Sequence, residues 1–488
     1  MIDAPVIGAR SFIDGTWRTP VERLGVLHDP NTGIERTEQL GATPEDVEAV
    51  LQAAELLHSS QALDRIPVQQ RAAALNGWAD ALDAKAEEIA IQDAVSTGNP
   101  LQTTRTLASF LGGRVRSAAR QAVEIGDGRT LEAGGRTVRL LNRALGPTLV
   151  LAPWNAPTFV AVSKIAAAVG AGSPSILKPS EWTPSGTQLA FKLLLDVLEH
   201  HRFPPSTAQL IHGAARVGSS LSSDPRVRAI TFTGGLAAGR AVARAAAETM
   251  AVVQLELGSN NPAIVMLDAD IARTADLLIS GVTRLNGQWC EAPGKVLVPE
   301  SLHDGLVDAL IASAESLRID HGFRDQCQLG PLAYRAHRER LEAQLDQYAK
   351  QGATVQRAGS LPALDGWFFR PAFVTDLAVS SARDEMFGPA LTVHGVTSVE
   401  EAIDAANLPG AGLGAFVFGS DEDAALDVGA RIHAGEVRIN GTQMADLAVG
   451  SEQTFWGTSG VGGHDPAHGV AFSQGRRVVG VDTPDLVL

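Results

Sequence analysis

Two side chains in this sequence could together carry out covalent chemistry on a carbonyl carbon. Cys290 lies in NGQWCEAPGK, directly after a helical pattern and at a Gly-Gln turn. A thiol near backbone N–H donors can be held as a thiolate and can attack a carbonyl. Glu256 lies near the end of the apolar segment VVQLEL and before a glycine, where partial desolvation would raise the pKa of its carboxyl toward neutrality, as a general base requires.

Each of these two residues also has an ordinary structural interpretation. A cysteine alone is more often a small buried hydrophobic side chain, and this interpretation suffices for Cys327 in RDQCQLGP. A glutamate that closes a strand is usually a solvated charge at the edge of a sheet. The chemical interpretation of Cys290 and Glu256 therefore depends on the residues around them.

A second group of residues has the character of a nucleotide site. Lys178 and Glu181 lie in ILKPSEWTP, where they could bind two adjacent ribose hydroxyls or form a simple surface ion pair. The segment FTGGLAAG places Gly234, Gly235 and Gly239 between a strand and a helix, where free N–H groups face an anion. Its spacing is not a strict G-x-G-x-x-G, so it is weak evidence for a dinucleotide by itself.

The elements that would position these residues repeat regularly between Gly146 and Asp268. Apolar strand candidates alternate with Ala-rich helical stretches at roughly 20- to 30-residue intervals, the spacing of parallel β-α-β units in an open doubly wound sheet. The strand candidates are PTLVLAP, PSILKP, AQLIH, RAITF and AVVQLEL. Such sheets bind ligands at the carboxyl ends of their strands.

The remaining segments suggest three further parts. Residues 1–125 are predicted to be mostly helical, and a second α/β domain is predicted after Asn261, with a long helical region up to Gln356. Its strand candidates are NPAIVML, KVLVPE, ALTVHGV, GAFVFG and GEVRIN. Residues 129–145 and the C-terminal GVAFSQGRRVVGVDTPDLVL read as exposed strands, which pair with another subunit or form an ordinary hairpin.

Composition limits the classes of function. The chain has 488 residues, with 40 Lys+Arg against 55 Asp+Glu and a net charge of −15, so a nucleic-acid partner is not expected. No segment is long and apolar enough for a membrane span, and we expect no membrane association. Two cysteines and a start without a signal-peptide pattern favour the cytoplasm. We expect two or three domains that act on small molecules.

Six motifs occur in one order along the chain: APWNAP, LKPSE, FTGG, LELGSNNP, NGQWC and EMFGP. Together with their spacing and the chain length, they resemble the aldehyde dehydrogenase superfamily over essentially the whole chain. The resemblance implies NAD(P)-dependent oxidation of an aldehyde to a carboxylic acid, of the non-phosphorylating and non-acylating type. It implies that Cys290 is the nucleophile, which forms a thiohemiacetal and then a thioester, that Glu256 activates the hydrolytic water, and that Asn155 contributes to the oxyanion hole.

The resemblance also implies how the cofactor is held. Lys178 and Glu181 would contact the adenosine ribose, Gly218 the adenine side, Trp154, Gly234 and Gly235 the pyrophosphate region, and Glu385 and Phe387 the nicotinamide ribose and ring. Glu181 favours NAD, because a carboxylate repels a 2′-phosphate, although NADP stays possible. No metal is implied.

The implied fold class is α/β, with a doubly wound Rossmann-like cofactor domain, an α/β catalytic domain and a small β oligomerisation segment. Residues 1–127 and 147–258 would form the NAD(P)-binding domain, 259–458 the catalytic domain, and 128–146 with 468–488 the oligomerisation segment. Exposed strand edges in this segment would aggregate if they were unpaired, so a homodimer or homotetramer is expected.

Four departures from the family's motifs bear on the site. Gly235 replaces the serine of F-T-G-S, and Asn260 replaces the lysine of E-L-G-G-K. Glu291 follows the nucleophile and would raise the thiol pKa if it pointed inward, whereas we expect it to point away. FWGTSGVGGHDP resembles a shortened form of the glycine-rich C-terminal signature, without its Arg-Glu ending.

Two other functions fit the same residues. One is a coenzyme A-acylating aldehyde dehydrogenase or an acyl-thioester reductase, although such relatives generally lack the carboxylate at Glu256. The other is a non-catalytic nucleotide-binding homologue, prompted by the departures. The small Ala156 after PWN and the aromatic Trp289 before Cys290 favour a medium-sized or aromatic aldehyde as the substrate.

Overall fold

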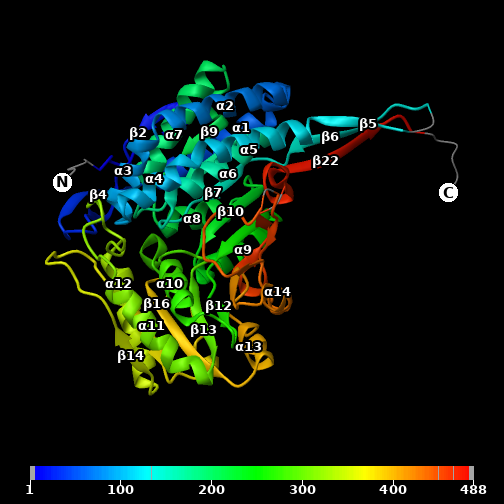
Figure 1. The fold of residues 1–488 in the computed structure, drawn as a ribbon. Coiled ribbons are helices and arrows are strands. Elements are labelled where there is room, and N and C mark those ends of the chain that lie inside the picture. Colours follow the sequence, from blue (N-terminus) through cyan, green and yellow to red (C-terminus); the bar gives the residue numbers. More distant parts are fainter. Residues whose placement is uncertain (1–5, 133–134, 449, 465, 483–488) are drawn as a thin grey trace.

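Two β-sheets, each covered by helices on both faces, organise the chain into two lobes, and a three-stranded arm projects from the first lobe (Figure 1). The structure is a computed structural model that describes residues 6–132, 135–448, 450–464 and 466–482. The two helix-covered sheets agree with the α/β class expected from the alternating strand and helix patterns.

The sheet of the first lobe has eight strands in the order β2-β1-β9-β8-β7-β10-β11-β20. Its five central strands, β9 to β11 in this order, run parallel, and β1 and β20 join the two sides antiparallel. The bounds are β1 Ser11–Ile13, β2 Thr16–Arg18, β7 Thr148–Leu151, β8 Ser175–Lys178, β9 Ala208–Leu210, β10 Ala229–Gly234, β11 Val252–Leu257 and β20 Gly460–Val461. Each of the five strands predicted between Gly146 and Asp268 is therefore present.

Alternate side chains of these short strands pack on opposite faces of the first sheet. Val150 and Leu177 join a core formed mainly by six helices, whereas Leu149 and Ile176 join a core formed mainly by three others, as the two-residue period of a strand requires. The first face carries α2 Val68–Ala84, α3 Ala86–Thr97, α4 Leu101–Ser109, α5 Leu111–Ile125, α6 Pro157–Ala171 and α7 Ser185–His200. The second face carries α1 Pro44–Ser59, α8 Ala215–Ser222 and α9 Leu236–Thr249.

Residues 1–125 are mostly helical, as predicted, because α1 to α5 cover most of residues 44–125, but the residues described before Thr43 are not helical. The helices begin at α1, whose start is fixed by a capping box between Thr43 and Asp46. The described residues before Thr43 form β1, β2 and the hairpin of β3 Glu22–His28 with β4 Glu35–Gly41. These strands gave little sign in the sequence, because β1 and β2 have three residues each and most side chains of β2, β3 and β4 are not buried.

The sheet of the second lobe has seven strands in the order β14-β15-β16-β13-β12-β17-β18, all parallel except β14. Its strands are β12 Asn261–Val265, β13 Pro293–Pro299, β14 Thr354–Arg357, β15 Ala372–Thr375, β16 Ala390–Val396, β17 Gly414–Phe418 and β18 Glu436–Ile439. Helices α10 Ile271–Val282 and α11 His303–Glu315 pack on one face, α13 Val399–Ala406 and α14 Glu422–Gly429 on the other, and α12 Arg335–Lys350 beside β14 and β15. The expected long helical region up to Gln356 is thus two helices separated by a loop.

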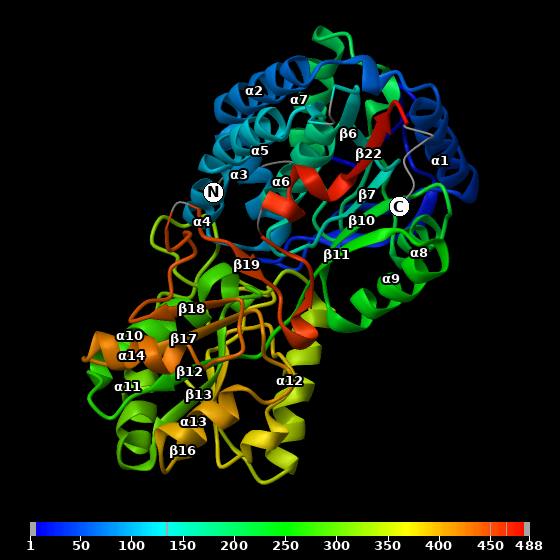
Figure 2. The ribbon, with the colours of Figure 1, turned by 90° about the vertical axis from the view of Figure 1, so that its right-hand side faces the viewer.

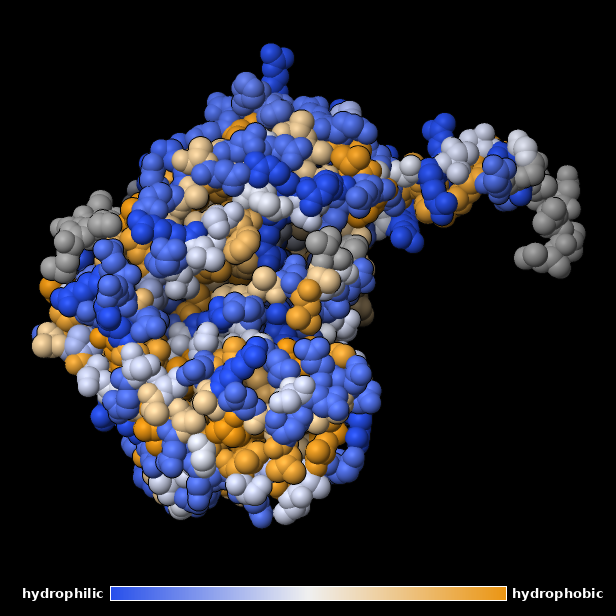
Figure 3. All heavy atoms as spheres, viewed as in Figure 1, coloured by the Kyte–Doolittle hydropathy of each residue, from blue (hydrophilic) through white to orange (hydrophobic). Residues whose placement is uncertain are grey.

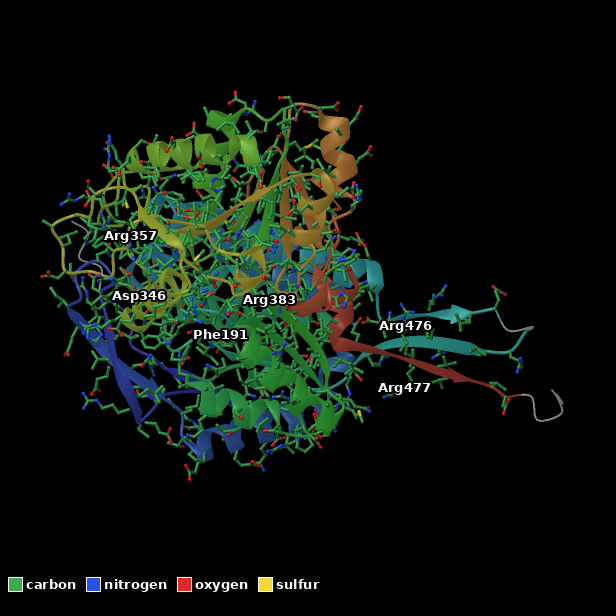
Figure 4. All side chains as sticks on the ribbon, turned by 90° about the horizontal axis from the view of Figure 1, so that it is seen from below. Phe191, Asp346, Arg357, Arg383, Arg476 and Arg477 are labelled. Atoms are coloured by element: carbon green, nitrogen blue, oxygen red, sulfur yellow. The ribbon has the colours of Figure 1, made fainter. Side chains whose placement is uncertain are left out.

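The arm consists of β5 Gly128–Leu131, β6 Val138–Ala144 and β22 Gln474–Gly480. All three strands are antiparallel, and β6 lies between the other two. Figure 4 shows the arm from below and labels Arg476 and Arg477 on β22. The strands predicted in residues 129–145 and near the C-terminus are confirmed, and they pair with each other in one chain; the predicted end of the last segment, residues 483–488, lies outside the described residues.

The C-terminal segment joins the two lobes. β20 adds to β11 of the first sheet, while β19 Gln453–Thr454 pairs with β21 Gly463–His464 and Gln453 donates a hydrogen bond to Leu413 O of the second lobe. Figure 2 shows β19 between the lobes, and Figure 3 shows a hollow between them. In the described part of the chain, no helix has the length and apolarity needed to cross a membrane.

Candidate active site

A strained turn places Cys290 between the lobes. Leu285, Asn286 and Gly287 have φ of 48°, 57° and 79°. This is a left-handed backbone conformation that residues other than glycine rarely adopt. Asn286 holds the turn, because its Nδ2 donates to Gly98 O and Pro331 O at 3.0 and 2.8 Å and its Oδ1 accepts from Gly330 N at 2.7 Å. The nucleophile candidate therefore follows a turn that the Asn286 side chain ties to two other segments of the chain, at Gly98 and at Gly330 with Pro331.

Asn155 follows β7 at the carboxyl edge of the first sheet and contacts the same turn. Its side chain is buried, and Nδ2 donates a hydrogen bond of 2.8 Å to Gln288 O, two residues before Cys290. Asn99 Nδ2 in turn donates to the backbone carbonyl of Asn155 at 3.3 Å. The structure thus places Asn155 beside the turn that precedes Cys290.

Cys290 and Glu256 are in direct contact. Cys290 Sγ donates to Glu256 Oε1 at 3.3 Å, and Thr233 Oγ1 donates to Glu256 Oε2 at 3.3 Å. Burial raises the pKa of the Cys290 thiol well above its usual value, and the negative charges of Glu256 and Glu291 raise it further. Without a ligand, the thiol is therefore protonated and its proton faces a carboxylate.

The expectation that Glu256 has a raised pKa was wrong. Burial acts to raise the pKa of this carboxyl, but the charges of His464 and Lys164 and the thiol hydrogen bond together lower it to about 2. His464 Nε2 lies 3.5 Å from Glu256 Oε2. Glu256 is therefore an ionised carboxylate that can accept a proton from a neighbour.

Sequence reasoning missed two of the groups that hold Glu256 in this state. Lys164, on α6, is buried with its Nζ 2.7 Å from Gln254 Oε1, and burial lowers its pKa to about 8 although Glu256 opposes this shift. The sequence does mark Lys164, because it is a single charged residue inside an apolar helical run. His464 lies in the C-terminal signature that departs from the family, and its partner is 208 residues away in sequence, so no local pattern joined the two.

Glu291 belongs to the group of charged side chains that influence the Cys290 thiol, whereas we expected it to point away from the thiol. Its Oε1 accepts a hydrogen bond of 3.2 Å from Gln453 Nε2. Burial raises the pKa of Glu291, and its charge is one of those that raise the pKa of the Cys290 thiol. The residue after the nucleophile therefore influences the thiol through its charge.

A second cluster lies where β8 ends. Lys178 is buried, and its Nζ donates to Gly213 O at 2.6 Å and to Pro179 O at 3.1 Å and lies 3.7 Å from Glu181 Oε2. A Cβ on Gly218 would lie 3.4 Å from Lys178 Cε, so this glycine leaves the Lys178 side chain its space. The predicted pair and Gly218 are thus adjacent.

The start of α9 leaves open space. Gly235 is the residue before the helix, and a Cβ there would meet nothing within 4 Å, so the free N–H groups of the first turn can approach an anion. A Cβ on Gly234 would instead lie 2.5 Å from the Phe232 ring. These two glycines fit a helix start that takes a phosphate group.

Glu385, Phe387 and Trp154 form a third group of predicted site residues, and Glu385 is among the carboxylates that raise the pKa of the Cys290 thiol. Glu385 is buried, which raises its pKa to about 8, and a Cβ on Gly258 would collide with its Oε2. Phe387 has a φ of 53° and accepts a hydrogen bond of 2.8 Å from His337 Nε2 through its carbonyl. The Trp154 ring meets the Phe387 ring edge-on at 5.3 Å. Residues predicted to hold one ligand therefore come from both lobes.

An apolar cluster adjoins the thiol. Its buried members are Leu107, Ala156, Leu285 and Trp289, and Phe159, Val160, Cys290, Ala292 and Met444 pack against them. The guanidinium of Arg114 lies 4.2 Å from the centre of the Phe159 ring. A hydrophobic molecule that approaches Cys290 from this side would meet aliphatic and aromatic side chains.

Comparisons with known proteins agree with this geometry. The model of the aldehyde dehydrogenase family matches residues 17–478. Betaine aldehyde dehydrogenase of Cereibacter sphaeroides is 31% identical over 463 residues, 93% of this chain and 93% of that protein. Geranial dehydrogenase of Castellaniella defragrans is 31% identical over 447 residues, 89% of this chain and 91% of that protein.

Solved structures show the same fold. Betaine aldehyde dehydrogenase from Staphylococcus aureus, in complex with NAD+, has a TM-score of 0.90 and 28% identity, covering 98% of this chain and 95% of that chain. Lactaldehyde dehydrogenase from Escherichia coli has a TM-score of 0.89 and 27% identity, covering 98% and 100%. The family and the fold expected from the six motifs are confirmed.

The electrostatics of Cys290 generate a testable prediction. Glu256→Gln removes a negative charge and replaces the carboxylate that accepts the thiol hydrogen bond, so the pKa of the Cys290 thiol should fall. Alkylation by iodoacetamide near neutral pH should become several-fold faster than in the wild type. Glu291→Gln should act in the same direction but less, because Glu291 makes no hydrogen bond to the thiol in the described structure.

Mass spectrometry of the alkylated protein locates the label. Cys290→Ala supplies the background from Cys327, the pKa of which burial raises to about 11. Equal or slower labelling of Cys290 in Glu256→Gln would show that the carboxylate does not disfavour the thiolate.

Proposed function

Because the chain belongs to the aldehyde dehydrogenase family, we propose that it oxidises an aldehyde to a carboxylic acid through a covalent intermediate on Cys290, with NAD as the hydride acceptor. The observation that carries this proposal is the contact of 3.3 Å between Cys290 Sγ and Glu256 Oε1. It joins a nucleophile candidate to an ionised base in a buried site between two lobes.

Glu256 has two tasks in this proposal. It accepts the thiol proton through Oε1, so that the Cys290 thiolate can add to the aldehyde carbon. Later it accepts a proton from the water that attacks the thioester, which yields the acid and frees the thiolate. The lowered pKa of Glu256 keeps the carboxylate ionised, and therefore able to accept a proton, at neutral pH.

Asn155 supplies a donor for the oxyanion. One hydrogen of its Nδ2 is used by Gln288 O, and the second is available to the oxygen of the aldehyde as it becomes negative. The backbone N–H of Cys290 is the second donor in our proposal. Because Asn155 is held by its own backbone contact with Asn99, this donor is positioned before the substrate arrives.

The residues present fit a dinucleotide. Lys178 and Glu181 would hold the adenosine ribose, with Gly218 on the adenine side. The open start of α9 at Gly234 and Gly235 would take the pyrophosphate together with Trp154. Glu385 and Phe387 would hold the nicotinamide ribose and ring. When bound, NAD supplies the acceptor for the hydride that leaves the aldehyde carbon. Support for NAD comes from the NAD+ complex of the Staphylococcus aureus relative and from the Glu181 carboxylate, which repels a 2′-phosphate.

The apolar cluster beside Cys290 supports a medium-sized or aromatic aldehyde. Ala156 and Trp289 are both buried members of this cluster, and a larger side chain at position 156 would occupy more of the space beside Cys290. An aromatic ring would gain contact with Trp289 and Phe159 that a two-carbon aldehyde cannot make. Because the nucleophile must remain a reduced thiol, a reducing compartment such as the cytoplasm suits this activity.

The arm supports a homodimer or a homotetramer. It leaves Val478, Val479 and Val481 exposed, and β22 is an edge strand in the order β22-β6-β5. Unpaired edges with exposed apolar side chains favour association with another chain. We divide the chain accordingly into a cofactor domain (residues 1–127 and 147–258), a catalytic domain (259–458) and an oligomerisation segment (128–146 and 468–488).

The nucleophile is tested by Cys290→Ala, which should abolish NADH formation from every aldehyde, measured at 340 nm. Cys327→Ser is the matched control, because it keeps a donor to Asp320 O far from the site and should retain wild-type turnover. Wild-type turnover in Cys290→Ala would contradict the assignment. If a product appears only when coenzyme A is added, the acyl group on Cys290 is transferred to coenzyme A and is not hydrolysed by water.

The substrate class is tested by comparing kcat/KM for benzaldehyde and acetaldehyde. We expect benzaldehyde to be preferred by at least about tenfold, because its ring buries apolar surface against the cluster. Ala156→Phe should fill this space and lower kcat/KM for benzaldehyde while leaving acetaldehyde turnover nearly unchanged. A preference for acetaldehyde in the wild type would contradict this substrate class.

Oligomerisation is tested by sedimentation. The wild type should sediment at two or four times the mass of one chain. Val478→Glu with Val479→Glu places charges on the exposed surface of β22 and should shift the protein toward the monomer. A wild type that remains monomeric at micromolar concentration would exclude the arm as an assembly surface.

A further inference from the structure

We propose that three side chains of α12 are positioning residues, which hold residues 384–387 in place against the nicotinamide half of the cofactor. The three side chains are those of His337, Arg340 and Gln344. We call residues 384–387, which include Glu385 and Phe387, the clamp segment. The inference rests on the proposed function and adds residues to it that the six motifs did not mark.

The clamp segment needs support from outside itself. It lies between a short helical turn, Val379–Ser381, and β16, and contains neither helix nor strand. Phe387 has a φ of 53°, in the left-handed region. A bulky residue keeps such a backbone conformation only where the surrounding contacts hold it there. The side chains that would face the cofactor therefore depend on what fixes this stretch of backbone.

One face of α12, labelled in Figure 2, supplies that support. Side chains spaced three and four residues apart donate hydrogen bonds to three carbonyls of the clamp segment: His337 Nε2 to Phe387 O at 2.8 Å, Arg340 Nη2 to Met386 O at 2.8 Å and Gln344 Nε2 to Asp384 O at 3.2 Å. Residues with this spacing share one face of a helix. Leu341 and Leu345 are buried in the core of the second lobe, so the helix that carries the donors is itself fixed.

The hydrogen on the His337 ring has one defined position. Arg340 Nη2 lies 3.4 Å from His337 Nδ1, and because a guanidinium only donates hydrogen bonds, Nδ1 must accept. Burial and the charge of Arg340 lower the pKa of His337 to about 4, so the ring is neutral near pH 7. The single N–H hydrogen of the neutral ring is therefore on Nε2 and points to Phe387 O.

His337 also relates the clamp segment to the first lobe. Its ring centre lies 5.0 Å from that of Trp154, which follows β7, and 5.9 Å from that of Phe387. The adenosine-ribose candidates are held separately, because Lys178 donates to Gly213 O and Pro179 O within the first lobe. Loss of the hydrogen bonds from α12 should therefore affect the nicotinamide half of the cofactor and spare the adenosine half.

Binding of two ligands tests this selectivity. NADH carries the nicotinamide ribose and ring, whereas ADP has the adenosine and two phosphates alone. His337→Leu removes the donor to Phe387 O and keeps an apolar side chain between the rings. By isothermal titration calorimetry, we expect the Kd for NADH to rise by about tenfold and the Kd for ADP to stay within about twofold.

Kinetics separate the cofactor from the nucleophile. In His337→Leu at saturating NAD, the rate of NADH formation in the first turnover should fall by about tenfold or more, because hydride transfer requires alignment of the two carbons. The burst of p-nitrophenol from p-nitrophenyl acetate requires Cys290 but no cofactor. Its amplitude should remain that of the wild type.

Conservative variants separate the hydrogen bond from the bulk of the ring. His337→Gln places an amide Nε2 as many bonds from Cα as the imidazole Nε2, so it should restore both NADH affinity and the first-turnover rate. Arg338→Met, on the same helix, is the matched control, because the Arg338 side chain donates to none of these carbonyls in the described structure. If His337→Leu does not fold, Arg340→Met removes the donor to Met386 O and should show the same selective loss.

The possible failures are distinguishable. Wild-type NADH affinity and first-turnover rate in His337→Leu, an equal loss of ADP affinity, or the same defect in His337→Gln would each overturn the role of α12. In these cases the wild-type burst and NADH formation would still support the proposed function. A wild type that gives no burst and forms no NADH with any aldehyde would overturn the proposed function itself.

Discussion

The burial of one carboxylate shapes the centre of this molecule. An isolated charge of this kind is costly to remove from water, so Glu256 requires compensating groups. They come from separate parts of the chain: Thr233 from β10, Lys164 from α6, His464 from β21 and the Cys290 thiol from the second lobe. The ionised state of Glu256 therefore depends on the correct assembly of both lobes and the C-terminal segment.

The same arrangement explains why the C-terminal segment crosses between the lobes. Gln254, the neighbour of Lys164, donates to Gly463 O, and Gln453 contacts both Glu291 and Leu413 O. A movement of one lobe relative to the other would change these contacts together with the distance between Cys290 and Glu256. The geometry of the reacting pair and the relative position of the lobes are thus linked.

The sequence predicts the elements that bury apolar side chains and the residues that lie in contiguous motifs. β7 to β13 follow apolar runs, so that Lys178 lies at the end of the predicted strand β8 and Asn155 shortly after the predicted strand β7. The strands before Thr43 were missed because β1 and β2 have only three residues each and β3 and β4 bury few side chains. The pKa of Glu256 was predicted in the wrong direction because burial was visible in the sequence, whereas His464, which acts to lower this pKa, meets Glu256 only in the folded chain.

The arm has a consequence for the order in which the protein can be completed during synthesis. Its central strand, β6, pairs with β22, so that Asn142 faces Arg476 across most of the length of the chain. β6 leaves the ribosome long before β22 exists, and closing so long a loop is slow because its contacts are distant in sequence. Until β22 has left the ribosome, one edge of β6 lacks its partner. The arm is consequently completed only after the strands and helices of both lobes have been synthesised.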